Sequence, residues 1–331
     1  MQRFFDFPAA VWAYFSEVDR RFAAGDPPAP LPAPGYQLEN ENLGGIRAVL
    51  WDIYGTLAGV GVGDLEAALG SPERLRQALQ AMINEYDLAA PLGSLFPHQP
   101  PAPALAELFL GLIDDTRLRA LAQGIEYPEI VIEDIWQSIL AQLATAGYHP
   151  PYEEPRLHTA QRWAYFFDGV FQQTYLYPGA AATLNRLRQA GIVQGIISNA
   201  QFYTPIHLRR LLRQDLGEPG LEFTDIFTDS LVLFSYELGY GKPNPRGFHK
   251  AIALLNRQGI TREEILYIGN DMLCDVWCSL RAGIRSAFFV GDATQTFAHA
   301  DDQRCRGLRP DGIFTAPDQV PPAILNRRRS Q

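Results

Sequence analysis

Cysteine is scarce in this chain: there are three, Cys274, Cys278 and Cys305, among 331 residues. Three unevenly spaced cysteines do not make the disulfide framework of a small secreted domain, and none belongs to a C-x-x-C pair of the kind that binds zinc. Cys274 and Cys278 are four residues apart, so on a helix they would share one face, where packing is their expected role. We expect a protein of the reducing cytoplasm.

Long apolar runs and an excess of positive charge are missing as well. No stretch reaches the roughly 18 to 20 apolar residues that a membrane-spanning helix needs, and residues 1–24 lack the basic start of a secretory signal. The formal net charge at pH 7 is −9. This opposes nucleic-acid binding, because such proteins use Lys and Arg to displace counterions. We expect a small-molecule substrate, with no membrane and no nucleic-acid partner.

The chain has the composition of a globular protein, with 47% hydrophobic and 20% charged residues. Residues 4–23 place aromatic and aliphatic side chains mostly three and four apart, which predicts an amphipathic helix. Its apolar face must be covered, either by the rest of the chain or by a second copy in a homodimer. Five prolines between residues 27 and 34 predict a semi-rigid connector. Residues 1–45 therefore form an N-terminal helix with its connector.

Short apolar runs further along the chain predict strands. Residues 46–52 form such a run, which ends in a carboxylate and is followed by Tyr54-Gly55-Thr56, as in a buried strand and its turn. Five more strand-like runs occur after residue 190, most of them separated by helical stretches: 193–198, 226–233, 265–268, 286–290 and 312–314. This alternation predicts the α/β class, with a parallel sheet covered by helices on both faces.

The segment between the first two strands has a different pattern. Apolar residues recur at helical spacing from about residue 64 to 173, which predicts an inserted, all-α cap domain. Residues 46–63 and 174–325 then form the α/β core, and residues 326–331 form a tail. In open parallel sheets, ligands bind beyond the carboxyl ends of the strands, so the site is expected at that edge of the core.

Polar side chains stand at these strand ends. Asp52 enters a glycine-containing turn with backbone N–H groups nearby, which suits a nucleophile, although a loop-capping aspartate is the plainer interpretation. Ser198 and Asn199 end the next run, where a hydroxyl and backbone amides can hold an anion's oxygens. Lys242 precedes Pro243 on a stretch that two prolines stiffen, and a cation there can neutralise a transferred charge.

Two carboxylates, Asp271 and Asp275, follow the run 265–268 and precede a helix. The helix dipole alone favours acidic residues in a first turn. The functional interpretation is that Asp271 joins Asp52 as an oxygen ligand of Mg2+, a hard ion usually held by one or two carboxylates plus substrate phosphate.

Taken in order, these segments resemble the motifs of the haloacid dehalogenase-like hydrolase superfamily. Asp52-Ile-Tyr-Gly-Thr56 is similar to the first motif, Ser198 to the second, Lys242 to the third, and the segment from Gly269 to Asp275 to the acidic fourth. The resemblance implies a Rossmann-like core with a helical cap between the first and second motifs. Such a cap closes over the site and selects the substrate.

The resemblance also implies catalytic roles. Asp52 would be the nucleophile, Ser198 would hold the transferred group, and Lys242 would stabilise its charge. Asp275 would orient Lys242 or a metal-bound water. The Mg2+ ligands would be Asp52, Asp271 and the backbone carbonyl of Tyr54. Substrate contacts are expected from three residues: Tyr54, Thr56 and Asn199.

Tyr54 departs from the family's phosphatases, which carry a second Asp at this position to protonate the leaving group. A positioned acid and base contributes roughly 10²- to 10⁴-fold in rate, so substrates with good leaving groups, such as acyl phosphates, are expected. Tyrosine here is similar to the 2-haloacid dehalogenases, which use no metal. Those enzymes, however, lack a carboxylate at the position of Asp271 and have Asn in place of Met272.

Three functions remain open from the sequence. The favoured one is a Mg2+-dependent phosphohydrolase that forms an aspartyl-phosphate from a small phosphorylated metabolite. The second is a metal-independent 2-haloacid dehalogenase that forms an aspartyl ester. The third is a non-catalytic protein of this fold that binds a phosphorylated ligand or a protein.

Overall fold

The computed structural model describes residues 3–22, 30–40, 43–60 and 72–325. The chain divides into two compact units. The core unit comprises residues 26–60 and 175–331, and the cap unit comprises residues 2–25 and 61–174. The expected boundary at residue 63 and the tail 326–331 lie outside the described residues.

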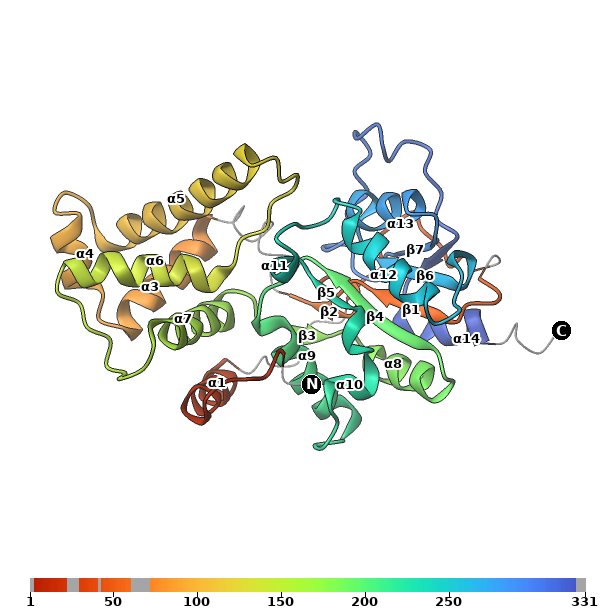
Figure 1. Cartoon of the computed structure of the whole chain (residues 1–331), viewed down its shortest axis with the longest axis horizontal. Helices are drawn as coiled ribbons and strands as arrows, with labels where there is room; N and C mark the ends of the chain where they lie inside the picture. The colour runs from red at the N-terminus through yellow and green to blue at the C-terminus, as the bar shows by residue number, and fades with distance from the viewer. Residues whose placement is uncertain (1–2, 23–29, 41–42, 61–71, 326–331) are drawn as a thin grey trace. The chain divides into compact units, whose positions relative to one another are not determined.

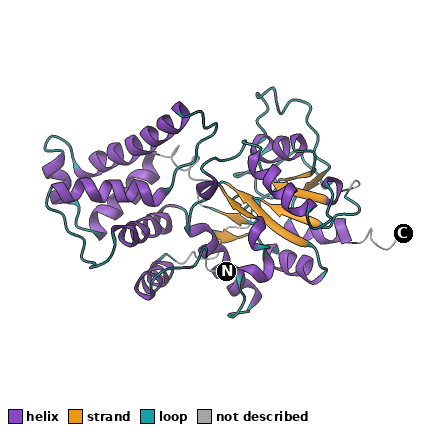
Figure 2. Cartoon of the chain, viewed as in Figure 1, coloured by secondary structure: helices purple, strands orange, loops and turns teal. Residues whose placement is uncertain are grey.

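A six-stranded sheet forms the centre of the core unit (Figures 1 and 2). Its strands are β1 (Ala48–Trp51), β4 (Val193–Ser198), β5 (Val232–Phe234), β6 (Ile265–Gly269), β7 (Arg285–Phe289) and β8 (Gly312–Phe314). They are all parallel, in the order β5-β4-β1-β6-β7-β8. The predicted α/β class with a parallel sheet is confirmed. A short antiparallel pair, β2 (Ala58–Gly59) and β3 (Tyr175–Leu176), lies outside this sheet.

The direction in which strands are added to the sheet reverses at β1. The chain runs from β1 to β4 and β5 on one side, and then returns to β6 on the other side. Trp51 pairs with Ile196 of β4 and with Ile268 of β6. The residues that follow these three strands therefore meet at the switch point of the sheet, where ligands of doubly wound folds bind.

Helices pack on both faces of the sheet. On one face, Phe248 and Leu255 of α12 (Arg246–Asn256) join a buried cluster that includes Leu50 and Tyr267. On the other face, the Gln194 side-chain amide donates to a backbone carbonyl of α8 (Ala180–Gln189). The remaining helices are α9 (Tyr203–Leu216), α10 (Phe223–Ile226), α11 (Ser235–Leu238), α13 (Cys278–Arg281) and α14 (Val320–Leu325).

One predicted strand is shorter than expected. Of the run 226–233, only Val232 and Leu233 pair in the sheet, as the first two residues of β5. The preceding residues form α10 and a 3₁₀ turn, because Glu222 and Asp225 make a reciprocal capping box that starts a helix.

The cap unit is built from helices. They are α1 (Ala9–Arg21), α3 (Pro72–Glu85), α4 (Ala89–Leu95), α5 (Pro101–Ala122), α6 (Ile132–Thr145) and α7 (Arg156–Phe171). Aromatic side chains fill its interior, where Trp136 and Trp163 are fully buried. No helix in the described part of the chain has the length and apolarity to span a membrane.

The N-terminal helix α1 packs on the cap unit. Phe15 stacks on Tyr165 of α7 with ring centroids 4.1 Å apart, and the hydroxyls of Tyr14 and Tyr86 lie 2.5 Å apart. Arg21 forms an exposed ion pair with Glu85. Residues 1–45 were expected to form one segment, whereas α1 belongs to the cap unit and the described residues from 30 onward belong to the core unit.

Replacing Phe15 by alanine should strongly destabilise the cap unit. Phe15 is 1% exposed, and truncation of a buried Phe typically costs about 3–5 kcal/mol. Leu118→Ala on α5 is the control, because Leu118 is 63% exposed and such changes stay within about 0.5 kcal/mol. Urea denaturation would measure the free energy of unfolding of both variants. Equal losses of this free energy in the two variants would contradict the docking of α1.

Candidate functional site

The first motif places its carboxylate at the end of β1. Asp52 directly follows Trp51, and its backbone N–H donates to the Ile268 carbonyl at 2.9 Å. The chain then turns through Gly55, whose φ of +80° lies in the left-handed region that glycine adopts without strain. A Cβ atom at this position would collide with the side-chain amide of Asn270. The turn therefore requires glycine for its conformation and for its space.

Lys242 connects the first, third and fourth motifs. Its Nζ donates to Asp52 Oδ1 at 2.7 Å and to Asp275 Oδ1 at 2.5 Å. The exposed fractions of the three side chains are 6%, 8% and 1%, respectively. The structure thus brings together three of the expected catalytic side chains. Because the charges are buried, loss of one partner would leave another uncompensated.

These charges shift one another's pKa values. Burial raises the pKa of Asp52 to about 6, although the Lys242 ammonium acts in the opposite direction. Burial alone would lower the pKa of Lys242, but the carboxylates of Asp275 and Asp52 outweigh it and raise that pKa well above its usual value. Lys242 is therefore charged at neutral pH, and Asp52 is mostly ionised, as a nucleophilic carboxylate must be.

A fourth member of this cluster, Tyr267 of β6, was missed by the sequence analysis. Its hydroxyl lies 3.0 Å from Lys242 Nζ and 3.0 Å from Asp275 Oδ1. In the sequence, a tyrosine inside an apolar run indicates only a strand. The available signal was its place two residues before Gly269, close to the strand end where site residues gather.

Ser198 ends β4 beside the nucleophile. Its side chain is 2% exposed, and its hydroxyl has no hydrogen-bond partner of good geometry among the described residues. The hydroxyl is close enough to Asp52 to help lower the pKa of that carboxyl, against the larger effect of burial. A buried polar group without a partner is unusual, and it is suited to a ligand that supplies an oxygen.

Asn199, for which a substrate contact is expected, holds the loop of Lys242. Its Oδ1 accepts from the Lys242 backbone N–H at 2.7 Å, and its Nδ2 donates to the Lys242 carbonyl at 3.2 Å. Both ends of the side-chain amide are thus bound to the backbone of the third motif. This two-point contact fixes the position from which the ammonium extends.

The hydroxyls of the first motif have partners within the core unit. Tyr54 shares a 2.8 Å hydrogen bond with Thr204 of α9. Thr56 donates to Asn270 Oδ1 at 3.0 Å, and Asn270 is 4% exposed. These contacts fix the turn between β1 and β2. Asn270 was not among the predicted site residues.

Asp271 stands at the N-terminus of a π-helical turn, Met272–Trp277. Its Oδ1 accepts from the backbone N–H groups of Leu273 and Cys274, both at 2.7 Å, and its Oδ2 lies 2.9 Å from His299 Nε2. No group of three or more His, Cys, Asp or Glu side chains gathers at a metal-binding spacing in the described residues. Mg2+ needs only one or two carboxylates, so Asp52 and Asp271 Oδ2 offer suitable oxygens if His299 gives way.

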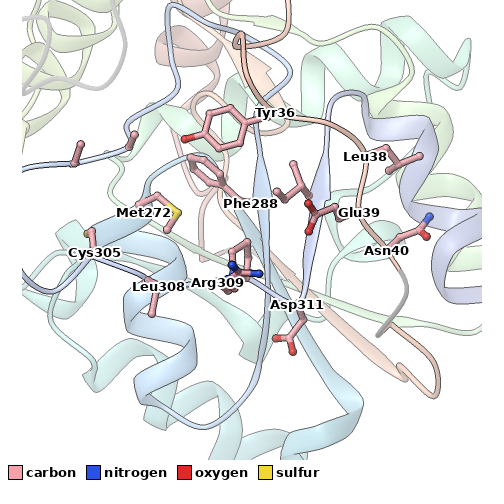
Figure 3. A pocket seen from close by; sticks show the side chains of 14 residues that line it. Tyr36, Leu38, Glu39, Asn40, Met272, Phe288, Cys305, Leu308, Arg309 and Asp311 are labelled. Carbon is pink, nitrogen blue, oxygen red and sulfur yellow. The ribbon is translucent and has the colours of Figure 1, made fainter.

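A separate hollow of about 1070 Å³ lies on the core unit (Figure 3). None of the predicted site residues lines it. Tyr36 packs edge-on against Phe288 in its wall, and Met272 connects it in sequence to the fourth motif. The other lining residues are Leu38, Glu39, Asn40, Ala298, Ala300, Cys305, Leu308, Arg309, Pro310, Asp311 and Ile313.

The sheet topology defines a Rossmann-like fold, with a buried cluster of two aspartates and a lysine at the carboxyl end of its central strands. The model of the haloacid dehalogenase-like hydrolase family matches residues 46–283. The chain belongs to this family, as its motifs predicted.

Two curated proteins are similar to part of the chain. Phosphoserine phosphatase from Thermus thermophilus is 31% identical over 143 residues, which cover 43% of this chain and 46% of that protein. Glyceraldehyde 3-phosphate phosphatase from Pyrococcus furiosus is 30% identical over 119 residues, which cover 35% of this chain and 43% of that protein. The similarity therefore spans less than half the length of either relative.

A solved structure is similar over most of the chain. The 2-haloacid dehalogenase from Pseudomonas syringae pv. Tomato is 21% identical in sequence and superposes with a TM-score of 0.52. The aligned region covers 84% of this chain and 97% of the dehalogenase chain. At this identity the similarity establishes the fold and leaves the reaction open.

Replacing Gly55 by alanine should destabilise the core unit by more than its backbone conformation alone. A left-handed alanine costs about 1–2 kcal/mol, and displacing Asn270 adds a packing cost of about 1–3 kcal/mol. Gly45→Ala isolates the first cost, because Gly45 has a φ of +79° with nothing within 4 Å of its Cβ position. If urea denaturation gives the same loss in free energy of unfolding for Gly55→Ala and Gly45→Ala, the Asn270 side chain moves aside at no cost.

Proposed function

We propose that the chain is a Mg2+-dependent phosphohydrolase that transfers a phosphoryl group to Asp52. The observation that carries the proposal is the buried Ser198 hydroxyl, which has no hydrogen-bond partner of good geometry within the described ranges and lies beside the contact between Asp52 and Lys242. A hydroxyl and an ammonium that flank a carboxylate can bind the oxygens of a phosphoryl group. The two curated relatives, both phosphatases by name, support the same reaction class.

The reaction would proceed in two displacements. A carboxylate oxygen of Asp52 attacks phosphorus, and the bond from phosphorus to the leaving oxygen breaks, with its electron pair departing on that oxygen. Lys242 and Ser198 hold the phosphoryl oxygens during this step. The oxygen of a water molecule then bonds to phosphorus while the bond from phosphorus to the Asp52 oxygen breaks. Its electron pair restores the Asp52 carboxylate, and inorganic phosphate leaves with both hydrogens of the water.

The ligands of Mg2+ would be Asp52, Asp271 and the backbone carbonyl of Tyr54. Bound there, the ion would neutralise charge on the phosphoryl oxygens. To bind the ion, Asp271 Oδ2 would give up its contact with His299 Nε2. The Asp271 Oδ1 contacts with the helix N-terminus would keep the carboxylate oriented.

The substrate class follows from Tyr54. This side chain replaces the acid that would protonate an alkoxide, and its hydroxyl is bound to Thr204. A carboxylate leaving group departs without a proton, so acyl phosphates of small metabolites fit the site better than alkyl phosphates.

A 2-haloacid dehalogenase is the second candidate. Tyr54 favours it too, because a halide also departs without a proton, and Asp52 would then form a carboxylic ester with the substrate carbon. This candidate gives no role to Asp271 as a metal ligand. Dependence of the reaction on Mg2+ separates the two candidates.

The wild-type protein should release inorganic phosphate from acetyl phosphate and from an aryl phosphate when Mg2+ is present. Chelation of the metal should abolish release, and Asp52→Asn should lower kcat at least about 10³-fold because it removes the nucleophile. Asp271→Asn should raise the Mg2+ concentration needed for half-maximal rate. No release from either substrate would refute the proposal, and turnover of 2-chloropropionate without metal would favour the second candidate.

Replacing Tyr54 by aspartate should widen the range of substrates. A carboxyl group at this position restores an acid and base, which contributes roughly 10²- to 10⁴-fold to hydrolysis of alkyl phosphates. Turnover of acetyl phosphate should change far less. Tyr54→Phe is the control, since it removes the hydroxyl, with its hydrogen bond to Thr204, and adds no carboxyl group. If Tyr54→Asp changes the turnover of alkyl phosphates and of acetyl phosphate by the same factor, protonation of the leaving group does not explain the role of this position.

A further inference from the structure

The hydroxyl of Tyr267 lies at the centre of the buried charge cluster. Its one hydrogen lies between two acceptors, the Ile197 carbonyl at 2.8 Å and Asp275 Oδ1 at 3.0 Å. Because Lys242 Nζ can only donate, the hydroxyl oxygen accepts from it at 3.0 Å whichever acceptor takes that hydrogen. The ring is fully buried and packs edge-on against Phe248, with centroids 4.8 Å apart. Both ends of this side chain are therefore fixed.

This side chain crosses the strand that carries the nucleophile. Tyr267 belongs to β6 and Ile197 to β4, and β1 lies between these two strands. The hydrogen bond to Ile197 thus ties the two neighbours of β1 together, one residue before Ser198 and close to Asp52. The position of the hydroxyl is set by the sheet itself rather than by a loop.

The ammonium of Lys242 has three hydrogens and three oxygen partners: Asp52 Oδ1, Asp275 Oδ1 and the Tyr267 hydroxyl. When a group is transferred to Asp52, that carboxylate loses its negative charge and its attraction for the ammonium. One hydrogen of Lys242 then becomes available for the transferred group. The other two partners must keep Nζ in place at that moment.

We propose that Tyr267 is a positioning residue, whose hydroxyl holds the Lys242 ammonium while Asp52 carries the transferred group. The inference rests on the proposed function for its role in turnover. Its structural part, that the hydroxyl restrains Nζ, applies to any reaction at Asp52. Without this hydroxyl, Asp275 Oδ1 would be the one protein partner left to Nζ, among the described residues, once Asp52 carries the group.

The composition of the chain makes this restraint measurable. The sequence contains two lysines, Lys242 and Lys250, and Lys250 is exposed. In protein labelled with ¹⁵Nζ-lysine, a buried ammonium with three acceptors should give a resolved NH₃⁺ signal with slow hydrogen exchange at neutral pH. The variant Lys250→Arg identifies the signal of Lys242.

The deciding experiment compares Tyr267→Phe with wild type and with Tyr177→Phe. Tyr177 is a matched control, because it is 2% exposed and its hydroxyl donates to a carboxylate, Asp292, at 2.8 Å in the same unit. Tyr267→Phe should speed exchange of the Lys242 hydrogens roughly tenfold, the worth of one hydrogen bond to a charged group. It should lower kcat for acetyl phosphate by a similar factor with little change in KM, whereas Tyr177→Phe should change neither quantity.

Unchanged exchange in Tyr267→Phe, or an equal effect of Tyr177→Phe, would overturn the inference. A wild-type protein without any resolved Lys242 signal would overturn it as well. The exchange measurement needs no substrate, so it decides the restraint even if wild type releases no phosphate. If wild type releases no phosphate, the proposed function is refuted, and the restraint of Lys242 by Tyr267 is still decided by the exchange measurement.

Discussion

The structure depends on one buried ammonium that lies between two buried carboxylates. Removing such charges from water costs several kcal/mol per ion, which is offset only when each charge has close partners of good geometry. Asp52 comes from the end of β1, Asp275 from the turn after β6, and Lys242 from the loop before α12. A slip of one residue in either strand would turn its side chains to the opposite face. The charge cluster therefore requires the native register of the sheet.

Much of the fold could be predicted from the sequence because its strands are short, continuous apolar runs. The run 46–52 and the run 265–268 both became central strands, as burial on both faces requires. The run 226–233 was misjudged because a capping box competed with strand pairing over part of its length. For the N-terminal helix, the pattern indicated an apolar face but could not identify its partner, since α7 lies far away in the sequence.

The candidate site was predictable where a polar residue follows a strand, as for Asp52 and Ser198. What the sequence could not supply is the direction of each side chain. Asn199 turns to the backbone of Lys242, and Asp271 meets His299, which lies 28 residues further along the chain. Tyr267 stayed hidden because tyrosine is common in strands for reasons of packing alone.

The docking of α1 on α7 has a consequence for the synthesis of the protein. Phe15 leaves the ribosome 150 residues before its stacking partner Tyr165. At about 5–20 residues per second, the aromatic face of the helix waits on the order of 10 to 30 seconds for its binding surface. Until Tyr165 is synthesised, this face is an exposed apolar surface, of the kind to which chaperones that shield nascent chains bind.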